Sequence, residues 1–378
     1  MEPFKNMWNE KFFDLFTKGL KSIIAGFDER KFLSQIFDAE WEKKELLQRG
    51  MHITTTLRKF LPADYKAATA KILELIDYLK KTQYWEKIEQ KSLKGMFGLS
   101  LEYGILSGFV EQYGLDDYKT SVKAIEQITQ FTSCEGAVRP FIIKYQNEMM
   151  KQMLIWSKHK NQWVRRLSSE GCRPRLPWNM ALPKLKENPA PIIPILENLI
   201  DDPEIFVRKS AANNLNDIAK DNPKTVIDFA KKWQGKSENI DWVLKHGCRT
   251  LLKQGNAEVM KIFGLRTDIK NISIKNFKIA TPKVKIGKSL EFSFNLLNKK
   301  KTKIRLEYGL YYQKANRTLS KKVYKISEKE YAENSTTLIT RKQSFRKVTT
   351  RVLHPGLHQI AVIVNGNEFE KHDFMLIE

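Results

Sequence analysis

The residues best suited to chemistry are concentrated in an eighteen-residue stretch from Asn161 to Trp178, NQWVRRLSSEGCRPRLPW. It holds one carboxylate, Glu170, two tryptophans, Trp163 and Trp178, and four arginines: Arg165, Arg166, Arg173 and Arg175. A solvated helix would interleave lysine with glutamate and carry few aromatic residues. Guanidinium and indole groups at this density predict a ligand that is acidic and planar.

Two further carboxylates lie near basic or aromatic segments. Glu135 follows Thr132 at capping-box spacing, before a helix that begins near Gly136, and the residues alone favour that structural role. Asp217 follows an amide-rich run of poor helix formers. Its structural alternative is an ion pair with Lys220, one turn later.

Glu170 stands just before Gly171, at a predicted helix C-terminus. Negative charge there opposes the helix macrodipole, so the position is locally unfavourable and indicates another use. An ion pair with Arg166, four residues earlier, is the structural alternative.

The elements that carry these residues are predicted to be helical from residue 1 to about 262. The segment 10–27 places Phe12, Phe13, Phe16 and Leu20 on one side of a helix, and helical spacing continues through 40–61, 63–81 and 118–131. Pro62, the pair Gly95 and Gly98, and Gly114 separate the helices.

Three segments of this region repeat one another: QWVRRLSS, IFVRKSAA and DWVLKHGC. Their anchoring valines, Val164, Val207 and Val243, recur at a spacing typical of two-helix repeats of the HEAT kind. The second helix of each repeat usually lines the concave side, so the basic residues beside the valines are predicted to face a ligand. The alternative is that each Val-Arg pair is ordinary HEAT pattern, with the arginine bound to a carboxylate of the neighbouring repeat.

From about residue 271 the pattern changes to short alternating runs, such as SLEFSFNLL and HQIAVIVNG, which are typical of antiparallel strands. Roughly seven strands in about 110 residues predict an immunoglobulin-like sandwich. The sequence therefore predicts a multidomain chain: an all-α HEAT-like repeat solenoid over 1–264 and an all-β immunoglobulin-like sandwich over 265–378. The atypical N-terminal helices are expected to cap the solenoid.

Charge indicates the class of partner. The chain has 66 Lys+Arg against 43 Asp+Glu, a net charge of +23, which points to a polyanion. Residues 265–378 hold 24 of these basic residues and 10 acidic ones, and could contact phosphate, although lysine-rich turns also protect sheet edges. With no long apolar span, lipidation motif or signal peptide evident, nucleic acid is favoured over a membrane. Three widely spaced cysteines indicate reduced thiols in a cytoplasmic protein.

Other chemistries have little support. His354 and His358 have ligand-like spacing, but no Cys or carboxylate cluster completes a zinc set, so no metal is expected. Neither a GxxxxGK[ST] loop nor a GxSxG elbow occurs, and no nearby histidine would activate Cys172. No cofactor is expected.

The runs SCEGAVRPF (residues 133–141), WVRRLSSEGCRPRLPW (163–178) and VRKSAANNLNDIAKDNP (207–223) resemble the bacterial DNA alkylation-repair glycosylases of the AlkC type, relatives of AlkD. The resemblance covers most of the chain and is strongest between about 130 and 225. It implies removal of N3-alkylated bases such as 3-methyladenine and 3-methylcytosine from duplex DNA. The residues that match the family's catalytic centre are Glu135, Glu170, Trp178 and Asp217. Some members carry an immunoglobulin-like domain.

That chemistry is physically coherent for these residues. An N3-alkylated base is cationic and already a good leaving group, so no strong general acid is required. Carboxylates in a water-poor cleft stabilise the oxocarbenium character of the sugar, and Asp217 is the expected general base for water. Trp178, between Pro177 and Asn179, is expected on a rigid loop rather than in the core, with its indole against the sugar or base. The AlkD relatives imply that the base is not flipped.

The sequence thus predicts a monomeric, cytoplasmic, nucleoid-associated DNA glycosylase of base excision repair. The residues expected to contact DNA are Arg139, Arg165, Arg166, Arg173, Arg175, Arg208, Lys209, Lys245 and Arg249. The alternative is a non-catalytic HEAT-repeat scaffold that binds nucleic acid or an acidic protein, with its carboxylates serving as structural pairs.

Overall fold

The computed structural model describes residues 3–82, 101–348 and 351–378, and its backbone packs into two compact units. The first unit comprises Met1–Asn222 and Gly235–Gly247, and the second comprises Pro223–Gln234 and Cys248–Glu378. The predicted boundary at 264/265 separates helices from strands along the chain. The packing units, in contrast, interleave between residues 222 and 248.

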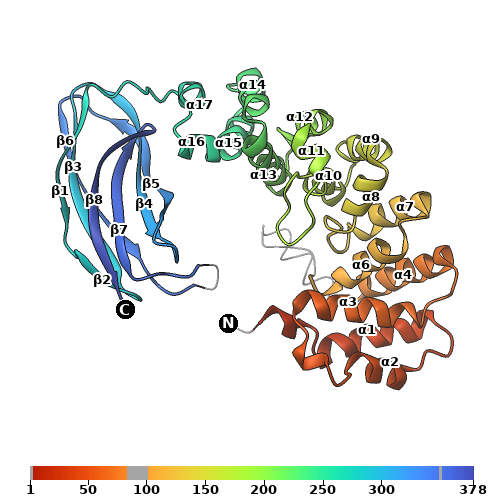
Figure 1. Ribbon diagram of the computed structural model, residues 1–378. Helices are drawn as coiled ribbons and strands as arrows, with labels where there is room; N and C mark the ends of the chain where they lie inside the picture. Colours follow the sequence, from red (N-terminus) through yellow and green to blue (C-terminus); the bar gives the residue numbers. More distant parts are fainter. Residues whose placement is uncertain (1–2, 83–100, 349–350) are drawn as a thin grey trace. The chain divides into compact units, whose positions relative to one another are not determined.

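The described part of the first unit contains helices and loops (Figure 1). Its α-helices are α1 (Glu10–Ile23), α2 (Glu29–Ile36), α3 (Leu46–Arg58), α4 (Tyr65–Lys80), α6 (Gly104–Tyr113), α7 (Tyr118–Ile128), α8 (Arg139–Lys144), α9 (Gln146–Trp156), α10 (Gln162–Glu170), α11 (Pro183–Glu187), α12 (Ile193–Leu199), α13 (Ile205–Asp221) and α15 (Glu238–Gly247). Single 3-10 turns lie at Phe4–Met7, Trp41–Lys43, Leu101–Tyr103 and Ala190–Ile192.

Side-chain caps and apolar faces explain where the N-terminal helices form. The Asn9 side chain accepts a hydrogen bond from the backbone amide of Phe12 at the start of α1, and Asp28, Asp64 and Asp117 cap α2, α4 and α7 in the same way. Each such cap contributes about 1 kcal/mol. The predicted face of α1 is confirmed, because all four of its named apolar residues are buried.

These helices pack in the manner expected of a cap on a repeat array. Helix α1 packs on α4 and α2 on α3, while α3 and α4 continue onto α6 and α7. The break at Pro62 falls between α3 and α4, and Gly114 ends α6. The predicted break at Gly95 and Gly98 lies outside the described residues.

The HEAT-like repeat is confirmed by α10, α13 and α15, which pack in succession (Figure 1). Val164, Val207 and Val243 are all fully buried. The Arg165 Nη1 donates to the carbonyl oxygens six and five residues earlier, and the Arg208 Nη1 makes the same two contacts in its own repeat. The shared Val-Arg pattern therefore has one local purpose: the arginine binds the backbone carbonyls of the preceding loop.

The described residues of the second unit form the helices α14 (Pro223–Trp233), α16 (Arg249–Lys253) and α17 (Ala257–Ile262), and two sheets (Figure 1). The strands are β1 (Ile272–Ile279), β2 (Lys283–Lys285), β3 (Ser289–Asn298), β4 (Thr302–Gln313), β5 (Leu319–Tyr331), β6 (Ser335–Ser344), β7 (Gly356–Val364) and β8 (Asn367–Ile377). One sheet has the order β1-β3-β6 and the other β2-β8-β7-β4-β5.

The two sheets enclose one apolar core, as the sequence predicted for a sandwich. Burial alternates along β3, so that Leu290, Phe292, Phe294 and Leu296 point into the core. This alternation is the two-residue period of a strand with one buried face.

The helical part of the second unit is joined to its sheets by side-chain hydrogen bonds to backbone carbonyl oxygens and by a close contact between two turns. Lys303 donates to the carbonyl oxygen of Phe263, and the Asn365 side chain donates to the carbonyl oxygen of Arg266. The turn between β7 and β8 lies directly against the loop before α17: a Cβ on Gly366 would stand 2.6 Å from the Cα of Gly255. Both glycines have positive φ, +82° and +73°.

We predict that Gly366→Ala destabilises the chain more than Gly287→Ala. Gly287 also has positive φ, +97°, but no atom within 4 Å of its would-be Cβ, so its substitution reports backbone strain alone, about 1–2 kcal/mol. The collision of the Gly366 Cβ with backbone should cost about 1–3 kcal/mol more. The measurement is denaturant unfolding of the full chain; equal losses in the two variants would contradict the close contact.

Candidate active site

Two buried carboxylates meet where α10 packs on α13. Glu170 ends α10 and is 5 % exposed, and Asp217 lies within α13 and is 2 % exposed. The Arg173 guanidinium lies between them: Nη1 donates to Glu170 Oε1 at 2.6 Å, while Nε and Nη2 lie 2.8 and 2.7 Å from Asp217 Oδ2. Like charges need such a counter-ion when they are brought together away from water.

The other oxygens of these two carboxylates are also bound. Ser210 Oγ donates to Glu170 Oε2 at 2.6 Å, and Lys220 Nζ donates to Asp217 Oδ1 at 2.8 Å. The pairing with Lys220 was the alternative predicted for Asp217, and it coexists with the Arg173 contact. Ser210 was missed. The signal for it was available, because the repeat places this serine where the preceding repeat has the apolar Leu167.

Glu135 joins the same cluster through Arg166. Arg166 Nη1 donates to Glu135 Oε2 at 2.6 Å, and its Nη2 lies 3.9 Å from Glu170 Oε1. Ser133 Oγ also donates to Glu135 Oε2, at 2.6 Å. The capping-box role predicted for Glu135 is wrong: α8 begins at Arg139, and its N-cap residue makes no side-chain cap bond.

The result is a continuous row of alternating charge, which we call the carboxylate cluster: Glu135, Arg166, Glu170, Arg173 and Asp217. Its three carboxylates outnumber its two guanidiniums, and Lys220 approaches from the solvent side. Burial lowers the pKa of both arginines, but the neighbouring carboxylates outweigh it and raise each pKa above its ordinary value. Both arginines therefore stay charged.

The same ion pairs lower the pKa of Glu135, whereas they raise the pKa of the two arginines. Burial raises it, but the Arg166 charge and the hydrogen bonds from Ser133 and Arg166 outweigh burial and hold the pKa below its ordinary value of 4.5. This carboxylate is therefore ionised at neutral pH.

Aromatic rings adjoin the cluster. The Arg166 guanidinium lies over the Phe206 ring, 4.6 Å from its centroid, and Trp163 meets the same ring edge-on at 5.3 Å. Phe206 and Trp163 occupy equivalent positions in the two repeats, directly before the buried valines.

Trp178 lies on the segment that joins α10 to α11, residues 171–182, which we call the tryptophan loop. Its side chain is 76 % exposed, so the core-packing alternative does not apply. Its φ is +63°, a left-handed conformation that bulky residues rarely adopt. Strain of this kind is typical of functional sites, where the surrounding structure holds a side chain in place.

The arginines predicted to contact DNA fall into different settings. Arg166 and Arg173 belong to the carboxylate cluster. Arg165 is bound bidentately by Asp202, before α13, which is the structural alternative stated for it. Arg208 binds carbonyl oxygens, and Arg175 pairs with Asp221.

The remaining predicted contacts differ in exposure. Lys209 is exposed, and Lys245 and Arg249 are half-buried. Arg139 requires a correction, because it is fully buried and donates to carbonyl oxygens of the tryptophan loop. Its guanidinium cannot reach a duplex in this conformation.

Cys172 and His358 are both buried, in settings that do not suit a nucleophile or a metal ligand. Burial raises the pKa of the Cys172 thiol to about 12, so it is not a thiolate at neutral pH. His358 is buried in the sandwich with Nδ1 3.1 Å from the Gly356 oxygen. Within residues 3–82, 101–348 and 351–378, no three or more His, Cys, Asp or Glu side chains are grouped to hold a metal.

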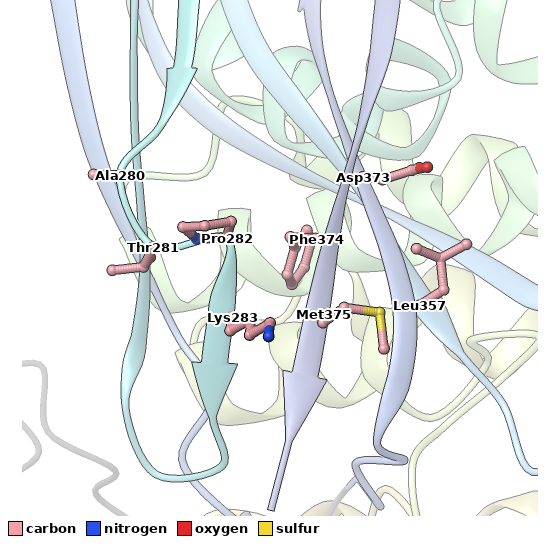
Figure 2. Close-up of a pocket in the computed structure, with 8 residues that line it drawn as sticks. All are labelled: Ala280, Thr281, Pro282, Lys283, Leu357, Asp373, Phe374 and Met375. Atoms are coloured by element: carbon pink, nitrogen blue, oxygen red, sulfur yellow. The ribbon is translucent and has the colours of Figure 1, made fainter.

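Figure 2 shows a pocket of about 590 Å³ in the second unit, at the edge where β2 pairs with β8. It is lined by residues 280–283, Leu357 and residues 373–375. Its one carboxylate, Asp373, accepts a hydrogen bond from Gln359. The pocket therefore brings together no set of groups for acid–base catalysis.

No described helix of the chain is long and apolar enough to span a membrane.

The chain is similar to known proteins over its whole length. Residues 107–271 match the family described as DNA alkylation repair enzyme, and residues 273–378 match the C-terminal Ig-like domain of the uncharacterised protein YhaZ. The chain is 37% identical to uncharacterized protein YhaZ of Bacillus subtilis strain 168 over 376 residues, 100% of both chains. It is also similar to the alkylpurine DNA glycosylase AlkC of Pseudomonas fluorescens, solved with DNA containing an abasic site analog: 28% identity, a TM-score of 0.89 and 100% of each chain covered.

We predict that Glu135→Gln lowers the free energy of unfolding at pH 7 by about 1–3 kcal/mol, the contribution of charge-assisted hydrogen bonds. Because folding lowers the pKa of Glu135, its stabilisation is complete above pH 4.5 and disappears as pH falls through the folded value. Urea unfolding of the unaltered protein and of Glu135→Gln between pH 7 and 3.5 measures the difference between their free energies of unfolding. The difference should shrink below pH 4.5, and a difference independent of pH would contradict the ion pair. The exposed Glu40→Gln is the control, with an expected change under about 0.5 kcal/mol.

Proposed function

Because the chain belongs to the DNA alkylation repair family, in an AlkC-like form with the YhaZ C-terminal Ig-like domain, we propose that it is a DNA glycosylase. Its proposed substrates are cationic N3-alkylated bases, 3-methylcytosine and 3-methyladenine, in duplex DNA. It would act without a metal or cofactor, as a step of base excision repair.

The observation that carries this proposal is the carboxylate cluster, together with an exposed tryptophan on the loop that contributes Arg173. Three carboxylates from separate segments converge on the buried guanidinium of Arg173 and the largely buried one of Arg166, and the tryptophan loop that supplies Arg173 also presents Trp178 to solvent. A stabilising core would not require this much charge to be buried, since apolar residues of similar volume usually serve as well.

Each group has a proposed role in base release. As the glycosidic bond of an N3-alkylated nucleotide breaks, the base leaves as a neutral molecule and the sugar becomes cationic. Glu170 and Glu135 stabilise that cation by fixed negative charge, which is more effective in a water-poor site than in bulk water. Asp217 orients the attacking water and accepts its proton. The exposed Trp178 indole lies against the sugar or the cationic base, an attraction of about 0.5–2 kcal/mol.

Arg173 gives the site its preorganisation. It is attached to both Glu170 and Asp217, so the two carboxylates are held in place before substrate arrives. A fixed electrostatic environment needs no reorganisation during the reaction, which is the main source of catalytic effect in such sites.

DNA binding is proposed to use the basic residues that remain accessible. Lys209 on α13 is exposed, and the second unit carries Lys299–Lys301, Lys321 with Lys322, and the run from Arg341 to Lys347. Phosphate contacts of this kind position a duplex without reading its sequence.

One observation favours the scaffold alternative: Arg173, Ser210 and Lys220 already satisfy the oxygens of Glu170 and Asp217. On that hypothesis the cluster only stabilises the fold, and the unaltered protein releases no base from methylated DNA.

We predict that Glu170→Gln and Asp217→Asn each lower base release at least about 100-fold, because loss of one electrostatic group in a preorganised site has that effect. Binding to the same duplex should change less than about threefold, since phosphate contacts supply most of the affinity. The measurement is chromatography of bases released from methylated duplex DNA, without added metal or nucleotide.

Asp221→Asn is the matched control. Asp221 lies one helical turn after Asp217 and pairs with Arg175 at the surface, so its loss should leave base release intact. No release by the unaltered protein, despite tight and salt-dependent binding, would replace the glycosylase proposal with the scaffold.

We also predict that Arg346→Ala with Lys347→Ala weakens DNA binding and reduces the slope of log K against log salt by about 1–2, since each lost phosphate contact releases fewer counterions. Both side chains are exposed. Lys18→Ala with Lys21→Ala removes the same charge from α1, where both lysines are in ion pairs, and should leave the slope unchanged. Equal slopes for the two double variants would argue against DNA contact by this loop.

A further inference from the structure

Among the described residues of the first unit, Arg139 is a fully buried arginine with three hydrogen bonds, all of them to one loop. Nη1 donates to the carbonyl oxygens of Gly171 and Arg173, both at 2.9 Å, and Nε donates to that of Met180 at 2.7 Å. One guanidinium therefore ties the beginning of the tryptophan loop to its end.

We propose that Arg139 is a positioning residue, which holds the tryptophan loop in its ligand-binding conformation before any ligand is present. The role of the loop in binding a damaged nucleotide rests on the proposed function. The mechanical role of Arg139 does not.

The loop has few hydrogen bonds between its own residues, so its conformation depends on contacts with neighbouring segments, and Arg139 makes three of these contacts. Two backbone hydrogen bonds lie within it, from Leu182 to Pro174 at 3.1 Å and from Asn179 to Leu176 at 3.2 Å. Trp178 is exposed, so burial of its indole does not stabilise the loop. Its left-handed backbone persists only where the surroundings over-determine it.

A second contact comes from the same side of the loop. A Cβ on Gly136 would stand 2.3 Å from Asn179 Oδ1, so the residue after Trp178 packs directly on the residue after Glu135. Gly136, just before α8, and Arg139, its first residue, thus hold the loop from the same side. This couples the position of Trp178 to that of Glu135.

The chemistry of the anchor requires arginine. A guanidinium presents its donors in a rigid planar fork, whereas a lysine ammonium is a point charge that cannot reach carbonyls at both ends of the loop. Burial lowers the pKa of Arg139 to about 10, which leaves it protonated at neutral pH. The carbonyl of Arg173 accepts one of these bonds, so the same anchor also positions the arginine that joins Glu170 and Asp217.

The direct test is native-state proteolysis of the full chain with trypsin. Arg175 is the one arginine of the loop followed by a cleavable bond, because Pro174 follows Arg173. Arg139→Met should raise the rate of cleavage after Arg175 at least about 10-fold, since local opening of the loop becomes easier. The cut is located by mass spectrometry at a temperature where circular dichroism shows the variant folded.

Arg49→Met is the matched control. Arg49 is also buried and also donates to backbone carbonyl oxygens, but those belong to Lys44 and Lys5. Its loss should destabilise the first unit without accelerating cleavage after Arg175. Where Arg139→Met does not fold, Arg139→Lys keeps the buried charge and provides the same measurement. Unchanged cleavage in a folded Arg139 variant would overturn the proposal, as would equal acceleration in Arg49→Met.

A kinetic measurement separates positioning from simple stability. Arg139→Lys should lower kcat for base release about 10- to 100-fold, the effect of a small misplacement, while the Kd for duplex DNA changes less than about threefold. Faster cleavage of the loop with an unchanged kcat would show that the position of the tryptophan loop does not matter for base release. If the unaltered protein releases no base, the proposed function fails, and the proteolysis still decides whether Arg139 positions the loop.

Discussion

The Arg173 guanidinium between Glu170 and Asp217 is the interaction on which the rest of the first unit's site depends. Two ionised carboxylates cannot be brought together away from water without a counter-ion, because desolvation and mutual repulsion both oppose it. The packing of α10 on α13 brings Glu170 and Asp217 together, and the tryptophan loop places Arg173 between them. The loop is therefore part of the electrostatic balance of the site, as well as the carrier of an aromatic side chain.

Much of the architecture could be predicted because it repeats. The buried valines and the periodic apolar faces are local patterns, and the structure places them as local patterns require. The alternation in β3 predicted a strand with one buried face in the same way. What the sequence could not provide was the interleaving of the packing units, since residues 223–234 have an ordinary helical pattern and nothing local shows which neighbours they pack against.

The candidate site was predictable in its residue types and less so in its partners. The repeat indicated that Arg165 could pair with the neighbouring repeat, and Asp202 makes that pair. The capping-box prediction for Glu135 is wrong because that spacing is short and common, whereas the partner of this carboxylate, Arg166, lies thirty-one residues away. The DNA contact predicted for Arg139 is wrong for a related reason: an arginine in a basic chain suggests a phosphate contact, and only the tertiary structure shows that this guanidinium is buried and donates to three carbonyl oxygens.

The carboxylates of the cluster come from three separate segments of the helical region: Glu135 lies before α8, Glu170 ends α10 and Asp217 lies in α13. Arrays of this kind stay foldable when whole repeats are gained or lost, because each repeat contacts only its neighbours. Here the gain of a repeat between α10 and α13 would preserve the fold but would separate Asp217 from Glu170. Selection for the cluster would thus fix the number of repeats across this region, while the N-terminal helices remain freer to vary in length over evolutionary time.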